Sequence, residues 1–243
     1  MSEDDHQLAA RVAQDAGRLL LALRETSDDG ATLRREGDAR ANVLILEALR
    51  AARPDDPVLS EESADDLGRL ESSRAWIVDP LDGTREFGEK DRDDWAVHVA
   101  LAIDGVAAIG AVALPARDMI LSTEPAPKVP PPSSGPARLV VSRTRPPAVT
   151  GAIQAALDAV LVPMGSAGAK AMAIVLGDAD VYAHAGGQYQ WDSAAPVAVA
   201  RAAGLHTSRL DGSPLVYNER DPYLPDLLIC RPELAAQVIE AAR

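Results

Sequence analysis

The sequence predicts a layered protein of helices and sheets, of the α/β (α+β) class, and three observations lead to that prediction. Apolar residues recur at helical spacing over residues 2–25, which is typical of a helix lying on a core. Two apolar runs, 95–103 and 106–114, flank an Asp-Gly pair that suits a tight turn between antiparallel strands. Helix and strand patterns alternate again from residue 138 onward.

The other elements of the first half follow in order along the chain. Ser2 and Asp5 fit a capping box at the start of the first helix. A second helix is expected from residue 38 or 39 to 53, because Pro54 cannot continue it. Short apolar runs predict three further strands, at 58–59, 75–78 and 119–121.

Residues 124–137 (EPAPKVPPPSSGPA) are too rich in proline, serine and glycine for regular structure, and we expect a surface linker there. The linker divides the chain into two halves, residues 1–123 and 138–243. We expect the first half to carry most of a metal site and the second half to complete it. The elements predicted for the second half are strands at 138–141, 180–183 and 227–230, and helices at 146–160, 167–176, 193–203 and from Pro232 onward.

Composition limits the classes of partner. The chain has 243 residues, of which 47% are hydrophobic, so it can bury a substantial core. Its net charge is −13, its basic residues are scattered and only 3% of residues are aromatic, which argues against a nucleic acid polymer as partner. A small phosphorylated substrate remains compatible with this charge, because bound cations reverse the local field.

The ends and apolar runs of the chain indicate a cytoplasmic protein without a membrane partner. The acidic N-terminus is the reverse of a secretory signal. The longest apolar region, 95–114, is interrupted by His98 and by an Asp-Gly pair, so it does not predict a membrane span. Cys230 stands alone in an apolar run, where a buried, inert thiol is expected. The sequence makes no prediction of oligomeric state.

Two carboxylates, Asp79 and Asp82, directly follow the apolar run of a predicted strand. Ionised carboxylates about 4 Å apart repel by roughly 4 kcal/mol at an effective dielectric near 20, so they need compensation. Oxygen-rich sites select hard cations such as Mg²⁺. Pro80 and Gly83 give the turn the backbone angles to aim both carboxylates at one point. An ordinary exit from a strand into a turn is the alternative interpretation.

Two distant segments favour the metal site. Glu61 and Glu62 end another short apolar run, and Asp192 stands just before an alanine-rich helical stretch. Adjacent strand residues face opposite sides, so only one of the two glutamates should coordinate a metal. Asp192 also suits the cap of the following helix, and both roles can hold together.

The blocks WIVDPLDGT at 76–84 and WDSAAP at 191–196, together with Glu62 and Thr84, resemble the inositol monophosphatase superfamily of Mg²⁺-dependent, lithium-sensitive phosphomonoesterases. The resemblance covers nearly the whole chain, up to LDGSP at 210–214. It implies a five-layer αβαβα sandwich with the metals between the halves. It also implies hydrolysis of a phosphate monoester by water that two or three Mg²⁺ ions activate.

The same resemblance assigns roles to the ligands. Asp79 would bridge two metals, with Glu62 and the backbone carbonyl of Leu81 completing one site, while Asp82 and Asp192 complete the other. Glu61 is the weaker candidate of its pair.

The resemblance also implies a proton relay at the attacking water. Thr84 would present its hydroxyl to that water, with Asp38 as the proton acceptor behind it. Family members usually carry a threonine shortly before this aspartate, where the present sequence has Arg34-Arg35-Glu36. A helix N-cap is the alternative role of Asp38.

Further residues are expected to contact the substrate. Gly165, Ser166 and Lys170 lie where a helix opens, and helix N-termini bind anions through free N–H groups. The segment is not a P-loop, because no glycine precedes the lysine. Gly83, Thr84 and Arg85 are expected to contact the substrate beside the metals.

The pair Ser142-Arg143 and the blocks LSEE, RDDWAVHVAL, GSAGAKAMA and HAGGQ resemble the CysQ-type 3′(2′),5′-bisphosphate nucleotidase branch of the superfamily, in its actinobacterial form. That resemblance implies removal of the 3′-phosphate of 3′-phosphoadenosine 5′-phosphate, a by-product of sulfate assimilation. Arg143 could then hold the second phosphate through its planar fork. Arg145 is the nearby competitor, and an ordinary surface arginine is the other alternative.

Other functions remain open at this stage. Activity on inositol 1-phosphate or fructose 1,6-bisphosphate is one alternative, because the metal chemistry is indifferent to the alcohol. A non-catalytic metal- or phosphate-binding regulator is another, which the intact carboxylate set disfavours. His98 is expected to be a satisfied sheet residue and His184 to line the pocket mouth, and neither should bind the metal.

Overall fold

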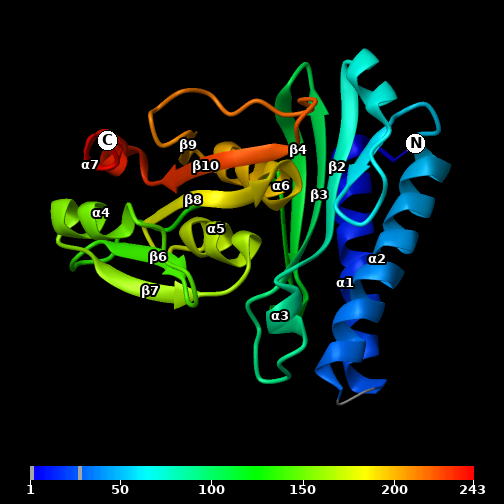
Figure 1. Cartoon of the computed structure of the whole chain (residues 1–243), viewed down its shortest axis with the longest axis horizontal. Helices are drawn as coiled ribbons and strands as arrows, with labels where there is room; N and C mark the ends of the chain where they lie inside the picture. Colours follow the sequence, from blue (N-terminus) through cyan, green and yellow to red (C-terminus); the bar gives the residue numbers. More distant parts are fainter. Residues whose placement is uncertain (1–2, 27–28) are drawn as a thin grey trace.

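Helices and sheets alternate in five layers in the computed structural model, which describes residues 3–26 and 29–243 (Figure 1). Helices α1 (Asp5–Thr26) and α2 (Gly30–Ala52) cover the outer face of the first sheet. Helices α5 (Ala167–Val175) and α6 (Gln190–Ala202) lie between the sheets, and α4 (Thr150–Leu157) and α7 (Ala235–Ala241) cover the second sheet. The expected αβαβα sandwich is confirmed.

The first sheet has the strand order β1-β2-β3-β4-β5. The Asp104-Gly105 turn joins β3 and β4 as predicted, and β1 alone runs parallel to its neighbour. Short helices follow some of the strands. The bounds are β1 (Val58–Ser60), η1 (Leu67–Glu71), β2 (Arg74–Asp82), α3 (Thr84–Phe87), β3 (Ala96–Ile103), β4 (Val106–Leu114), η2 (Pro115–Arg117) and β5 (Met119–Ser122).

The second sheet has the strand order β7-β6-β8-β10-β9. Its strand β6 runs parallel to both neighbours, while β10 is antiparallel to both of its own. The bounds are β6 (Arg138–Ser142), β7 (Val160–Met164), β8 (Val181–Tyr189), β9 (His206–Ser208), β10 (Tyr223–Cys230) and η3 (Pro232–Leu234).

The middle layer of helices connects the two sheets. Helix α6 packs on β2, β3 and β4 of the first sheet and on β10 of the second. Its small residues allow this close approach, since Ala194, Ala195 and Ala198 are buried against both sheets. Residues 124–137 contain no helix or strand, and the division of the chain at this segment stays a prediction.

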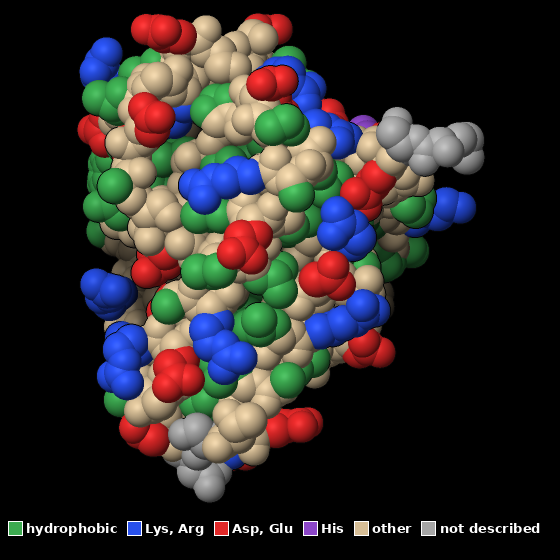
Figure 2. Space-filling view, turned by 90° about the vertical axis from the view of Figure 1, so that its right-hand side faces the viewer, with side chains coloured by type: hydrophobic (Ala, Val, Ile, Leu, Met, Phe, Trp, Pro, Cys, Tyr) green, Lys and Arg blue, Asp and Glu red, His purple; other side chains and the backbone are tan. Residues whose placement is uncertain are grey.

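The outer layer is amphipathic, as the leucine pattern of the sequence predicts. Leu8, Val12 and Leu20 of α1 are completely buried against the first sheet. The opposite face of α1 and α2 mixes acidic, basic and apolar side chains (Figure 2). Among the described helices, none is both long and apolar enough to cross a membrane.

The predicted start of the second helix is wrong. Helix α2 begins at Gly30, and the side chain of Asp29 caps it by accepting from Ala31 N at 3.1 Å. Asp38 therefore lies inside the helix, which rules out its alternative role as N-cap. Gly37 also lies inside the helix, where tertiary packing favours glycine: a Cβ there would lie 2.8 Å from Phe87 Cε1 and 3.0 Å from Leu81 Cδ2.

Other boundaries also differ from prediction. The helix expected at 146–160 covers only 150–157, because Asp158 adopts a left-handed conformation that ends it. The following strand β7 was not predicted, since Val160 and Leu161 face solvent at the sheet edge and give no core pattern. Strand β9 was also missed, and β8 continues six residues beyond the predicted end at 183. Ser2 of the predicted capping box lies outside the described residues.

The packing around Gly37 makes a testable prediction. Alanine favours a helix interior over glycine by about 0.5–1 kcal/mol, but overpacking a core costs about 1–3 kcal/mol. We expect Gly37→Ala to lower the free energy of unfolding by about 1–2 kcal/mol in urea denaturation. Gly151→Ala in α4 is the matched control, because nothing lies within 4 Å of its added Cβ, and it should be neutral or slightly stabilising. Equal stabilisation by both variants would contradict the packing account.

Candidate active site

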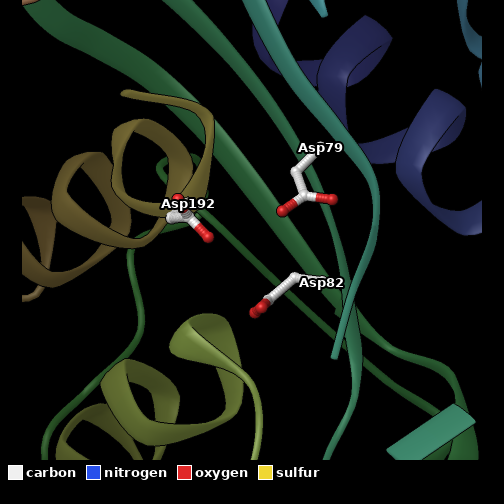
Figure 3. A group of neighbouring side chains, drawn as sticks. All are labelled: Asp79, Asp82 and Asp192. Atoms are coloured by element: carbon white, nitrogen blue, oxygen red, sulfur yellow. The ribbon is translucent and has the colours of Figure 1, made fainter. Parts of the chain in front are cut away.

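Three aspartates from separate elements meet between the sheets. Asp79 and Asp82 stand at the end of β2, where the pairing with β3 is interrupted between them, and Asp192 comes from the first turn of α6. One carboxylate oxygen of each lies within 4.8 Å of the others, and the three side chains converge on one space (Figure 3). The predicted grouping of these three residues is thus observed.

The turn after β2 fixes this arrangement. Asp79 Oδ1 accepts from Leu81 N at 3.0 Å, which bends the chain back toward the carboxylate. Gly83 adopts a left-handed φ of 83°, a conformation that glycine tolerates best, and it begins the short helix α3. Helix α6 begins at Gln190 rather than at the predicted residue 193, so Asp192 is not the residue before the helix but its third residue. Its Oδ2 accepts from the N–H of the N-cap residue Tyr189 at 2.6 Å.

Burial and mutual repulsion raise the pKa of two of these groups. Asp79 is almost completely buried, and burial together with the charges of Glu61 and Asp82 holds its pKa well above the usual range. Burial and the charge of Asp82 raise the pKa of Asp192 to about 7. A carboxyl group with a raised pKa resists ionisation unless a cation compensates it.

Asp82 has the opposite environment. Burial alone would raise its pKa, but the contact with His98, the hydrogen bond from Ser166 and the charges of His98 and Lys170 hold it well below the usual range. Ser166 Oγ donates to Asp82 Oδ2, and the N–H groups of Ala167 and Gly168 donate at 3.0 and 2.6 Å. The N-terminus of α5, which the sequence predicts to bind an anion of the substrate, therefore binds the carboxylate of Asp82.

His98 lies beside Asp79 and Asp82, a position in the site that the sequence did not predict. It is completely buried, with Nδ1 3.1 Å from Trp191 O and Nε2 3.3 Å from Asp82 Oδ2. Burial disfavours the charged imidazole, but Asp82 outweighs this effect and raises the pKa of His98. The antiparallel register places His98 opposite Asp79, so a correct strand alignment would have revealed it.

Of the two glutamates, the sequence favours Glu62 as the metal ligand, whereas the structure favours Glu61. Glu61 and Asp79 each perturb the pKa of the other carboxyl group, and the charge of Glu61 raises the pKa of Asp79. Both glutamates are exposed and lie outside the three-aspartate cluster, but the charge of Glu61 acts on Asp79, whereas that of Glu62 acts on Asp38. Strand β1 ends at Ser60 opposite Val78, so the next residue, Glu61, comes level with Asp79. Glu61 and Glu62 follow the end of β1, so the rule that adjacent strand residues face opposite sides does not apply to them.

The pKa of the Glu61 carboxyl group is unusually high. Its pKa rises to about 7 because the carboxyl group is desolvated and faces the charges of Asp82, Glu62 and Asp38, although the residue as a whole is exposed. Glu61 thus belongs to the same repelling set of carboxylates as Asp79.

The proposed proton relay is close but not aligned in this structure. Thr84 Oγ1 lies 3.4 Å from Asp38 Oδ1 and 3.0 Å from the carbonyl oxygen of Leu81. A hydroxyl donates only one proton at a time, so Thr84 can serve one of these acceptors at once. Burial and the charge of Glu62 raise the pKa of Asp38 to about 7.

One cavity of about 240 Å³ adjoins the aspartate cluster, and it is lined by every residue predicted to contact the substrate. These residues are Gly83, Thr84, Arg85, Ser142, Arg143, Gly165, Ser166 and Lys170. Glu86, Thr144 and Arg145 complete the polar part of the wall. The structure therefore brings the predicted substrate residues together, while their contact with a substrate stays a prediction.

Lys170 does not point its charge at the open cavity. Its Nζ donates to the carbonyl oxygens of Gly165 and Ser166 at 3.1 and 2.6 Å. Burial lowers its pKa, although nearby acidic groups oppose this effect. A second cavity of about 340 Å³ begins at Ser142 and Lys170 and is bounded by His184, Gly186 and Gly187, as expected for the pocket mouth.

The donor set fits a hard divalent cation. Asp79, Asp82 and Asp192 offer only oxygen, the Leu81 carbonyl is adjacent, and the nearby imidazole of His98 is held by Asp82 and Trp191 O. The raised pKa values show that the carboxylates lack enough positive charge from the protein itself. A magnesium ion would supply that charge.

The sequence from residue 5 to residue 243 matches the model of the inositol monophosphatase family. The chain belongs to the inositol monophosphatase family. This finding confirms the resemblance inferred from the motifs, and the family is metal-dependent, in agreement with the acidic cluster.

Several members of the inositol monophosphatase family are similar over almost the whole chain. A 3′-phosphoadenosine 5′-phosphate phosphatase of Mycobacterium tuberculosis is 54% identical over 237 residues, which cover 93% of this chain and 89% of the relative. The enzyme of the same name from Mycobacterium leprae is 50% identical over 257 residues, covering 98% and 93%. The crystal structure of CysQ from Bacteroides thetaiotaomicron has a TM-score of 0.77 at 25% identity, covering 94% of this chain and 97% of that chain.

The carboxylate cluster predicts how stability depends on pH without metal. Asp38, Asp79 and Asp192 have folded pKa values above the unfolded value near 4, so their contribution to stability is lost as pH rises above 4 and, for Asp38 and Asp192, through about 7. We expect the chelated protein to melt at a lower temperature at pH 8 than at pH 5.5. Saturation with Mg²⁺ at about 100 times Kd should raise Tm at pH 8 by roughly 5–10 °C.

The matched variant for this melting experiment is Asp79→Asn. It removes one repelling charge while keeping an oxygen for Leu81 N. The chelated variant should melt higher than the chelated wild type at pH 8, and the Mg²⁺-dependent rise should shrink. A rise of equal size in both proteins would contradict the assignment of Asp79 to the metal site.

Proposed function

We propose that this protein is a Mg²⁺-dependent phosphomonoesterase that removes the 3′-phosphate of 3′-phosphoadenosine 5′-phosphate. The observation that supports the proposal is the position of the three-aspartate cluster, which can hold a phosphate through bound cations, beside a cavity whose wall carries Arg85, Arg143 and Arg145. A bisphosphate could place one phosphate at each. The names of the mycobacterial relatives support this substrate.

The chain's role at the metal is to provide oxygen ligands from three directions. Asp79, Asp82 and Asp192 would hold the ions, with Glu61 and the Leu81 carbonyl at the edge of the cluster. When bound, two or three Mg²⁺ ions polarise phosphoryl oxygens and make a nucleophilic water available. The hydrogen bonds of Asp82 to α5 keep one carboxylate ionised and fixed.

Thr84 and Asp38 would manage the proton of the attacking water. The Thr84 hydroxyl is a weak base, so a proton acceptor must stand behind it, and Asp38 Oδ1 lies 3.4 Å away. A pKa near 7 suits such an acceptor at neutral pH, because the carboxylate is partly ionised and basic enough. The departure at Arg34-Arg35-Glu36 does not displace Asp38 from Thr84.

Substrate selectivity would come from the cavity. Its arginines can bind a phosphate that is not hydrolysed, and Arg143 provides a planar fork for that purpose. Inositol 1-phosphate has no second phosphate and would gain nothing from these residues. The same metal cluster could nevertheless hydrolyse it slowly.

The test is phosphate release from four substrates at equal Mg²⁺: 3′-phosphoadenosine 5′-phosphate, adenosine 3′-monophosphate, inositol 1-phosphate and fructose 1,6-bisphosphate. We expect the largest kcat/KM for 3′-phosphoadenosine 5′-phosphate, loss of all activity on chelation, and inhibition by lithium. Activity that survives exhaustive chelation would exclude the metal mechanism. A larger kcat/KM for inositol 1-phosphate would exclude the proposed substrate.

The proposed relay is checked in the same assay with Thr84→Ala. Loss of positioned proton transfer should lower kcat by roughly 10²–10⁴-fold while Mg²⁺ still raises Tm. Thr207→Ala in the distant strand β9 is the matched control and should leave kcat within about twofold of wild type. An unchanged kcat in Thr84→Ala would remove the hydroxyl from the mechanism.

A further inference from the structure

Arg143 of the substrate cavity is already held by two carboxylates of the chain. Its Nε donates to Glu86 Oε1 at 2.8 Å. Its terminal nitrogen lies 2.7 Å from the same oxygen, and 2.9 and 3.1 Å from the two oxygens of Glu89. These contacts raise the pKa of Arg143 further above its usual range, Glu89 contributing first. Any phosphate that binds this guanidinium must compete with them.

Glu86 and Glu89 differ in how easily each can move away from Arg143. Glu86 belongs to α3 and is 6% exposed, and its carboxyl group fills the space beside Gly165, where a Cβ would lie 2.3 Å from Glu86 Cδ. Glu89 follows the helix, and 43% of its side-chain surface is exposed. Glu86 is thus a permanent partner of Arg143, whereas Glu89 can swing into water at little cost.

We propose that Glu89 occupies the place of the unhydrolysed phosphate on Arg143 and must leave when a nucleoside bisphosphate binds, which makes Glu89 a specificity-determining residue. The inference rests on the proposed function and deepens it. Both oxygens of Glu89 contact one guanidinium nitrogen, and phosphate oxygens can take those same positions. Glu86 keeps the guanidinium oriented while the exchange occurs.

The exchange separates substrates by charge. A phosphate dianion carries more charge than a carboxylate, so it can replace Glu89 on Arg143. A substrate with a single phosphate at the metals leaves the Arg143–Glu89 pair intact and gains nothing from it. A weakly charged group in place of the second phosphate would not compensate for the lost Arg143–Glu89 ion pair.

The expected size of the effect follows from the exposure of Glu89. An exposed ion pair contributes a factor of about 1.4–5 to an equilibrium. Repulsion between the displaced carboxylate and an arriving phosphate adds a factor of roughly five at most in water. The product of the two factors spans about 1.4 to 25, and we expect removal of the Glu89 charge to favour bisphosphate binding by the middle of that range, about three- to tenfold.

The experiment compares Glu89→Gln with Asp91→Asn, a matched loss of charge two residues away at an exposed position whose charge acts on Arg24. The substrates are 3′-phosphoadenosine 5′-phosphate and adenosine 3′-monophosphate, which differ only in the 5′-phosphate. We expect Glu89→Gln to raise kcat/KM for the bisphosphate about three- to tenfold through KM. The monophosphate should change by less than about twofold, as should both substrates with Asp91→Asn.

Two further measurements make the outcome decisive. In an Arg143→Ala background, Glu89→Gln should no longer affect the bisphosphate. Calorimetric binding of adenosine 5′-monophosphate without Mg²⁺ probes only the phosphate assigned to Arg143. Its Kd should fall about three- to tenfold in Glu89→Gln whether or not the protein hydrolyses the bisphosphate.

The results that overturn the inference are distinct from failure of the proposed function. An equal gain on both substrates would indicate general charge steering rather than exchange on Arg143. A gain that persists without Arg143, or a weaker Kd for adenosine 5′-monophosphate in Glu89→Gln, would reject the role of Glu89. A wild-type preference for inositol 1-phosphate would instead reject the proposed substrate, and the calorimetric result would still decide the role of Glu89.

Discussion

The rest of the site depends on one electrostatic constraint, the burial of several carboxylates within reach of one another. Asp79 and Asp82 are placed by the end of β2, and α6 adds Asp192 because its packing between the sheets fixes where its first turn lies. The protein compensates only part of this charge. Asp82 is satisfied by α5, Ser166 and His98, whereas Asp79 and Asp192 keep raised pKa values. Asp82 is therefore a ligand that the protein itself keeps ionised, whereas Asp79 and Asp192 need a cation to become ionised.

The same elements that hold the carboxylates also form the cavity. The N-terminal end of α5 faces Asp82 on one side and presents Gly165, Ser166 and Lys170 to the cavity on the other. Helix α3 starts at Thr84 beside the metal cluster, and its Glu86 orients Arg143 across the cavity. Metal site and substrate cavity are therefore mechanically linked, and a change in either would be felt by the other.

Local signals explain which parts of this structure the sequence could predict. The hairpin at Asp104-Gly105 and the aspartates of β2 are encoded by neighbouring residues, and the motif around Asp192 is equally compact. Prediction and structure differ where residues distant in the sequence determine the local structure. Gly37 stays helical because Phe87 packs on it, Glu61 faces the cluster because β1 is in register with β2, and Asp82 fills the helix end that was expected to bind substrate. His98 gave no local signal at all.

The central claim is that a divalent cation replaces protons on the buried carboxylates. Its most direct test is calorimetric titration of the protein with Mg²⁺ at pH 6.5 and pH 8.5, in buffers of different ionisation enthalpy. Because metal ligands must be deprotonated, the account predicts release of about one proton or more at pH 6.5, little release at pH 8.5, and tighter binding at the higher pH. Binding that releases no protons and has the same affinity at both pH values would contradict the account.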